Sequence, residues 1–170
     1  MNCINFVVPM NPCLCGAYPD KEKCRCTTQQ IRQYIGKISQ PILDRLDMTI
    51  EVFPIKYERL RKEGKEESSA AIKKRVYAAR KSQEKRFKTI GISCNAEMTR
   101  KEIEIFCCLD EKGEQLLKQL YAEEETSTRS YYRLLRLART IADLEGSENI
   151  QKEHLAEAYC YRSLGKKYWR

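Results

Sequence analysis

Apolar residues recur at helical spacing through most of the chain beyond residue 57. Ile72, Val76, Ala79 and Phe87 form one such series, and they predict a helix from Ser68 to Lys88 whose core face they make up. The same reasoning predicts helices over residues 99–108, 128–145 and 151–162, and one that starts at Asp110 and turns Leu116, Leu117, Leu120 and Tyr121 inward.

Polar residues and glycine indicate where several helices begin and end. Thr27 and Gln30 have the spacing of a capping box, in which each side chain bonds the other residue's backbone N–H group, so a helix over residues 27–38 is predicted. Ser127 is expected to cap the helix that follows it. Gly146 is expected to end that helix, because glycine readily adopts the left-handed conformation of a C-terminal cap.

Two short segments have the pattern of strands instead. Asn5–Val8 ends in an apolar run, and Met48–Phe53 alternates apolar and polar side chains up to Pro54. We therefore expect a mainly α protein in which residues 1–56 contain a remnant of an α/β core and residues 57–170 form an all-α bundle.

Composition and charge limit the classes of protein to which the chain can belong. Lys and Arg number 32 against 24 Asp and Glu, a net charge of +8, which permits a polyanionic partner such as DNA. No apolar run is long enough to span a membrane, and we expect no membrane partner. Nine cysteines without a secretory signal predict reduced thiols and a cytoplasmic location.

Four of these cysteines lie within one polar loop. Cys13, Cys15, Cys24 and Cys26 form two Cys-x-Cys pairs, and four thiolates can bind one tetrahedral zinc ion. Such a site would be structural, because four protein ligands leave no open position. Free thiols and a redox pair are the alternatives.

Two arginines are candidates for phosphate chemistry. Arg129 falls in the first turn of the helix after Ser127, where free N–H groups and a guanidinium suit a phosphate; a solvated basic face is the alternative. Arg45 lies between Asp44 and Asp47, just before a predicted strand. It is either a surface ion pair or an arginine directed at something outside the domain.

The helix from Ser68 to Lys88 carries eight basic residues and one Glu. Most such helices are simply solvated, but this charge is also typical of a nucleic-acid contact, with these candidates: Lys73, Lys74, Arg75, Arg80 and Lys81. His154 has no evident acid–base partner in the sequence. The chain has no Gly-x4-Gly-Lys-Ser/Thr loop and no apolar run ending in paired acids, so we expect it to hydrolyse no ATP by itself.

Several motifs together resemble the C-terminal half of the magnesium-chelatase-like AAA+ ATPases of the ComM/YifB group. The resemblance spans nearly the whole chain and rests on these segments: Met10–Gly16, Cys24–Thr27, Gln40–Asp47, Gly64–Ser69, Ala138–Gly146, His154–Ala158 and Tyr161–Arg162. Leu14 departs from the proline usual between the first two cysteines, and Walker A and Walker B are both absent.

The resemblance implies a role for three residues. Asn11 would be the sensor 1 residue near the γ-phosphate, Arg45 the arginine finger that reaches the neighbouring subunit's ATP, and Arg129 the sensor 2 residue of a helical lid. It further implies ATP and Mg²⁺ as cofactors, a hexameric motor and an association with DNA. In the whole AAA+ sheet the strand that carries Walker A lies between the two predicted strands. The two predicted strands should therefore lack their shared neighbour, and the first third of this chain should be poorly supported.

The expected function is therefore that of a C-terminal part of such an ATPase, supplying sensing and trans-activating residues. One alternative is a small zinc-bearing module that binds nucleic acid through the helix Ser68–Lys88. Another is a regulatory fragment that joins full-length hexamers as an inactive subunit.

Overall fold

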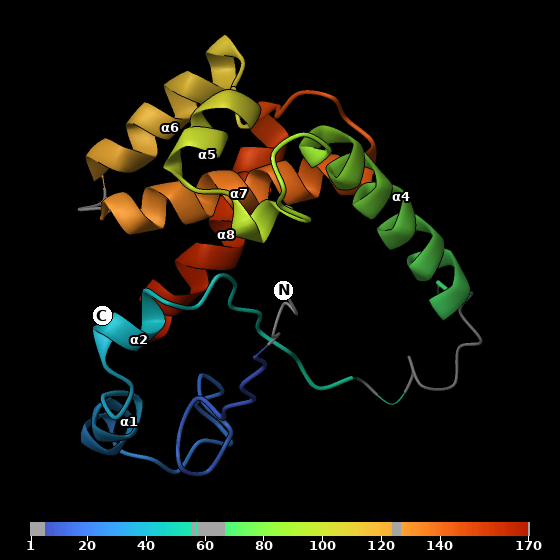
Figure 1. Cartoon of the computed structure of the whole chain (residues 1–170). Helices are drawn as coiled ribbons and strands as arrows, with labels where there is room; N and C mark the ends of the chain where they lie inside the picture. Colours follow the sequence, from blue (N-terminus) through green and yellow to red (C-terminus); the bar gives the residue numbers. More distant parts are fainter. Residues whose placement is uncertain (1–5, 56, 58–66, 124–126, 170) are drawn as a thin grey trace. The chain divides into compact units, whose positions relative to one another are not determined.

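The structure is a computed structural model that describes residues 6–55, 57, 67–123 and 127–169. Within these ranges the chain is mainly α-helical, which confirms the predicted fold class (Figure 1). The helices are α1 (Thr28–Ile35), α2 (Gln40–Leu43), α4 (Ser69–Phe87), the 3₁₀-helix η1 (Asn95–Glu97), α5 (Arg100–Phe106), α6 (Glu111–Glu123), α7 (Thr128–Glu145) and α8 (Lys152–Trp169). None of the helices in this part of the chain is long and apolar enough to cross a bilayer.

Two compact units make up the chain. Residues 1–46 with 165–170 form the smaller unit, and residues 47–164 form the larger one. The domain boundary near residue 57 stays a prediction.

The predicted helix caps are confirmed. Thr27 Oγ1 accepts a hydrogen bond from the Gln30 N–H group (3.2 Å), and Gln30 Oε1 accepts one from the Thr27 N–H group (2.9 Å). Ser127 Oγ accepts from the Ser130 N–H group at 3.2 Å, and Gly146 ends α7 with a left-handed φ of 74°. These caps satisfy backbone groups that a helix end otherwise leaves without partners.

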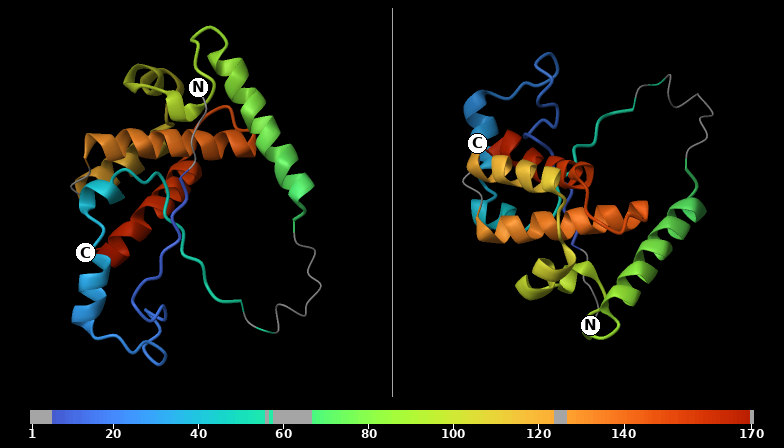
Figure 2. Two further views of the ribbon diagram at one scale, coloured as in Figure 1. Left: turned by 60° about the horizontal axis from the view of Figure 1, so that its bottom comes forward. Right: turned by 90° about the horizontal axis from the view of Figure 1, so that it is seen from above.

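Helix α7 is the centre of the larger unit. Helices α4, η1 and α5 pack against it, and α7 runs through the middle of this unit (Figures 1 and 2). Apolar residues from α4, α5, α6, α7 and α8 and from the segments between these helices form one core, whose buried members are Phe87, Met98, Ile103, Cys107, Leu117, Leu134, Leu135, Ala138, Ile141, Ala142, Ile150, Leu155 and Ala158.

The predicted strands Asn5–Val8 and Met48–Phe53 are both wrong over the described residues; Asn5 lies outside them. Phe6 and Val7 are 81% and 85% exposed, and residues 48–53 have no strand structure. A strand is stable only when a neighbour pairs with its backbone groups, and the described residues supply none. Their one bridge of this kind joins Leu109 to Ile150.

The predicted core face of α4 is correct only toward its C-terminal end. Ala79 and Phe87 are buried, whereas Ile72 and Val76 are 42% and 45% exposed. Figure 2 shows the reason: the N-terminal half of α4 extends beyond the other described helices of its unit. Tyr121 of α6, which was also expected to face inward, is half exposed.

Candidate functional site

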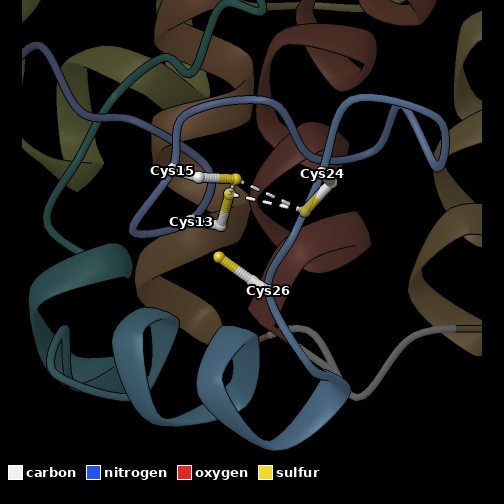
Figure 3. Close-up of side chains that lie close together, drawn as sticks. All are labelled: Cys13, Cys15, Cys24 and Cys26. Carbon is white, nitrogen blue, oxygen red and sulfur yellow. Dashed lines mark hydrogen bonds between the residues drawn. The ribbon is translucent and has the colours of Figure 1, made fainter.

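The four cysteines of the N-terminal loop come together. The Sγ atoms of Cys13 and Cys15 are 3.4 Å apart, and that of Cys24 lies 3.8 Å from the first and 3.6 Å from the second. With Cys26, all four sulfurs lie within 4.8 Å of one another and point toward a common centre (Figure 3). A tetrahedral zinc site with Zn–S bonds of about 2.3 Å requires S–S distances of about 3.8 Å. The sulfur cluster therefore has the size of such a site.

Short-range backbone bonds hold this loop. Gly16 adopts a left-handed φ of 78°, which lets its N–H group donate to the Cys13 carbonyl oxygen at 3.1 Å. The Tyr18 N–H group points at Cys13 Sγ (3.5 Å), as suits a thiolate acceptor. Asp20 closes the second half of the loop, since its carbonyl oxygen accepts from the Cys24 N–H group at 2.8 Å.

The cysteine pKa values move in opposite directions. Hydrogen bonds, first of all from the Ala17 backbone, lower the pKa of Cys15 to about 6. The pKa of Cys24 rises to about 11: a bond from the Cys26 backbone acts against this, but lost hydration and the neighbouring thiols Cys15 and Cys13 outweigh it. Four thiols this close cannot all ionise unless a cation is present, and a bound metal ion would supply that charge. The donor set fits zinc.

Asn11 and Arg45 belong to the smaller unit, and both are exposed. The Asn11 side chain lies beside Gly16, 3.7 Å from the position that a Cβ atom would take there. Arg45 lies two residues after the end of α2, and its N–H group donates to the Ile42 carbonyl oxygen at 2.9 Å. Its side chain therefore extends from a defined turn.

Arg129 lies exposed in the first turn of α7, as the sequence predicted. The arginines that follow it on that face are engaged in the fold. Arg133 Nη1 donates to Asp47 Oδ1 at 2.9 Å, and Arg136 Nη1 donates to the Ala96 carbonyl oxygen at 3.0 Å. The face is thus not a uniform solvated basic surface.

All five basic candidates on α4 are exposed: Lys73, Lys74, Arg75, Arg80 and Lys81. Some have partners, since Arg75 pairs with Glu67 at 3.0 Å and Lys81 Nζ lies 4.9 Å from the centre of the Tyr77 ring. Consecutive helical residues are about 100° apart, so these five surround the helix on several sides instead of forming one stripe.

Sequence reasoning missed a buried polar network at the centre of the larger unit. The carboxylate of Asp143 on α7 accepts hydrogen bonds from Arg86 on α4, from Asn95 Nδ2 on η1 at 2.8 Å, and from Arg139 Nε at 3.1 Å. We call these four residues the Asp143 network. The i, i+4 spacing of Arg139 and Asp143 was the available signal, but it could not predict the partners from α4 and η1.

His154 does have an acid–base partner, contrary to the sequence reading. Its ring is buried, Nδ1 accepts from the Gln151 N–H group at 2.9 Å, and Nε2 lies 2.8 Å from Glu145 Oε2. The geometry assigns the proton to Nε2, because Nδ1 accepts a bond. His154 thus joins the start of α8 to the end of α7.

Two family models cover almost the whole chain. The model for "Magnesium chelatase, subunit ChlI C-terminal" matches residues 66–162, and the model for "Magnesium chelatase, subunit ChlI" matches residues 2–60. The chain therefore belongs to the magnesium chelatase subunit ChlI family.

The relatives define the group more narrowly. The chain is 38% identical over 160 residues to competence protein ComM of Haemophilus influenzae, covering 94% of this chain and 30% of ComM. It is 36% identical over 162 residues to the uncharacterized protein YifB of Salmonella typhimurium and 37% identical to that of Escherichia coli, covering 95% of this chain and 31% of each relative. It thus spans less than a third of the length of these relatives, and the resemblance to the ComM/YifB group is confirmed.

Proposed function

We propose that this chain supplies three residues to the nucleotide sites of an ATP-driven hexameric motor that acts on DNA: Asn11 as sensor 1, Arg45 as arginine finger and Arg129 as sensor 2. Membership of the magnesium chelatase family supports an ATP- and Mg²⁺-dependent oligomer. The observation that carries the proposal is the exposed Arg129 in the first turn of a capped 18-residue helix.

The first turn of α7 suits an anionic ligand. Its first intrahelical hydrogen bond runs from Tyr131 to Ser127, so the N–H groups of Thr128 and Arg129 precede the helical ladder. The partial positive charge of the helix end adds to the guanidinium of Arg129. This group of donors would bind a phosphate of ATP and draw the lid toward it.

Arg45 would act on a different side of the nucleotide. In the proposed hexamer its guanidinium reaches the ATP of the next subunit and offsets charge on the transferring phosphoryl oxygens. Such an arginine increases the rate by about a thousandfold or more in other nucleotide hydrolases. Mg²⁺ would neutralise charge on the bound ATP. The groups of this chain that suit ATP are those that would donate hydrogen bonds to its phosphates.

The test uses a chimera in which this chain replaces the matching 30% of H. influenzae ComM. Arg45→Ala should abolish ATP turnover and leave nucleotide affinity nearly unchanged, because the finger acts in trans. Arg129→Ala should weaken nucleotide binding. Arg32→Ala, which removes another exposed arginine of the smaller unit, is the control and should change neither quantity.

Mixing distinguishes action in trans from action in cis. An Arg45→Ala chimera combined with a chimera that lacks the Walker A lysine should regain turnover, since one subunit supplies the site and the other the finger. If mixed hexamers form and no ratio restores hydrolysis, the trans role of Arg45 is wrong.

A second candidate function is a zinc-bearing module that binds nucleic acid. The sulfur cluster favours the zinc, and the five exposed basic residues of α4 favour the nucleic acid. In this proposal zinc would order the loop ahead of α1, because binding by thiolates couples the metal to folding. Metal content and salt-dependent DNA binding test the two parts separately.

A further inference from the structure

A short segment of the larger unit is bonded to both α7 and α8. Asp47 Oδ1 accepts from Arg133 Nη1 at 2.9 Å, and its carbonyl oxygen accepts from Arg162 Nη1 at 3.2 Å. Two residues later, the N–H and Oγ1–H groups of Thr49 both donate to the Tyr161 carbonyl oxygen, each at 2.8 Å. We call residues 47–49 the tether.

The tether connects to the turn of α7 that carries Arg129. Arg162 also donates through Nη2 to Ser130 Oγ at 3.2 Å, and Ser130 is the residue after Arg129. Arg133 lies one helical turn beyond Arg129 on the same face, and its side chain is only 18% exposed. Two arginines thus connect the first two turns of α7 to the tether: Arg133 lies in these turns and bonds Asp47, and Arg162 bonds both Ser130 and Asp47.

Along the chain, the tether begins two residues after Arg45. Successive Cα atoms are about 3.8 Å apart, so the Cα atoms of Arg45 and Asp47 lie within about 8 Å of each other. Fixing Asp47 therefore limits where the backbone of Arg45 can go, whatever the arrangement of the two units.

We propose that Asp47, Arg133 and Arg162 are positioning residues that couple the first turns of α7 to the segment bearing Arg45. The inference rests on the proposed function. Phosphate bound at Arg129 fixes the start of α7, Arg133 and Arg162 transmit that position to Asp47, and Asp47 sets the placement of the arginine finger. The nucleotide bound in one subunit would thereby control hydrolysis in the next.

The exposure of Asp47 indicates that its bonds serve to position the chain near Arg45 and do not mainly stabilise the fold. Its side chain is 74% exposed, and ion pairs with an exposed partner contribute little to the free energy of folding. Hydrogen bonds from Arg133 and Arg162 to Asp47, and from Thr49 to the Tyr161 carbonyl oxygen, nevertheless restrict the direction of the tether. Displacing a catalytic group by about 1 Å can cost about a hundredfold in rate, so a bond of little stabilising value can still control turnover.

The experiment measures kcat and KM of the chimera with the ion pair reversed. Asp47→Arg should lower kcat by about tenfold to a hundredfold and leave KM within about twofold, because the interaction matters only when the finger acts. Adding Arg133→Asp restores the pair with opposite polarity and should recover most of kcat. The unfolding temperature should change little in either variant.

The control is an exposed ion pair in the same unit, Arg100 with Glu104 on α5, whose N–O distance is 2.8 Å. Glu104→Arg, alone and with Arg100→Glu, should leave kcat and KM unchanged. Hydrogen exchange at the Thr49 amide gives a readout without turnover. Its protection should fall in Asp47→Arg and return in the double variant.

The outcomes separate the two proposals. If Arg45→Ala keeps normal turnover, the proposed function is wrong and the coupling with it. If Arg45→Ala is inactive while Asp47→Arg keeps normal kcat, the coupling alone is overturned. A change in KM without a change in kcat, or a loss of kcat that follows a loss of stability and is not recovered by reversal, also overturns it.

Discussion

Replacing Asp143 with alanine should destabilise the larger unit by several kcal/mol. The Asp143 side chain is only 1% exposed, and so is that of Arg139 at 2%, whereas Arg86 is 16% exposed. Removing the carboxylate leaves two guanidinium groups near each other without their shared counter-ion. Asn95, which donates to the same carboxylate, loses that partner as well.

The structure places the expected loss at the lower end of the usual range. Removing one partner of a buried ion pair costs about 3–5 kcal/mol. Arg139 keeps two other acceptors, the carbonyl oxygens of Glu148 (2.8 Å) and Ser147 (2.7 Å), and Arg86 retains some contact with water. We therefore expect a loss of about 3 kcal/mol, which for a chain of this size lowers the unfolding temperature by about 6–12 °C.

The assay is urea and thermal unfolding at pH 7, followed by far-UV circular dichroism. The matched control is Glu104→Ala, which breaks an ion pair whose two side chains are 74% and 57% exposed and should lose less than about 1 kcal/mol. Asp143→Asn keeps one acceptor oxygen and should fall between the two. Equal losses for Asp143→Ala and Glu104→Ala would refute the idea that the network holds α4 and η1 to α7.

Three further predictions follow from the same structure. Burial acts to raise the pKa of Asp143, but hydrogen bonds from Arg86 and Asn95 and the charge of Arg139 outweigh it, so the pKa is lowered. The stabilisation by the Asp143 network should therefore be complete above about pH 4, the pKa of Asp in the unfolded chain, and should be lost as the pH falls further. If acid unfolds the unchanged chain and the Asp143→Asn variant alike, this prediction is contradicted. Elemental analysis of protein prepared under reducing conditions without chelator should find one zinc per chain, and Cys13→Ser should lose it, whereas Cys108→Ser, a change at an exposed cysteine outside the cluster, should not. We expect weak DNA binding whose affinity falls steeply with salt. Reversing three charges of α4, by Lys73→Glu, Lys74→Glu and Arg75→Glu together, should abolish it. Equal affinity for DNA at low and high salt would dismiss this role of α4.

The candidate residues could be predicted only where the signal is local. The two Cys-x-Cys pairs lie close in sequence, so a single loop can bring their sulfurs together, and the cluster was foreseen. The position of Arg129 in the first turn of a helix was foreseen, because that position depends only on the cap residue just before it, Ser127. Asp47 and Thr49 were not foreseen as contacts of α7 and α8, because their partners lie more than 80 residues away along the chain.

What the sequence alone determined about this protein are most of its helices and the caps at Thr27, Ser127 and Gly146; α1 ends earlier, at Ile35, and α8 extends further, to Trp169, than the pattern predicted. Thr27 with Gln30, and Ser127 with Gly146, act on neighbouring backbone groups, and such short-range bonds need no other part of the chain. Only the tertiary structure decided which apolar faces are covered, that residues 6–8 and 48–53 form no strands, and that Asp143 is surrounded by Arg86, Arg139 and Asn95. Burial, strand pairing and buried ion pairs all depend on partners distant in the sequence, and local patterns carry no information about which partners will be there.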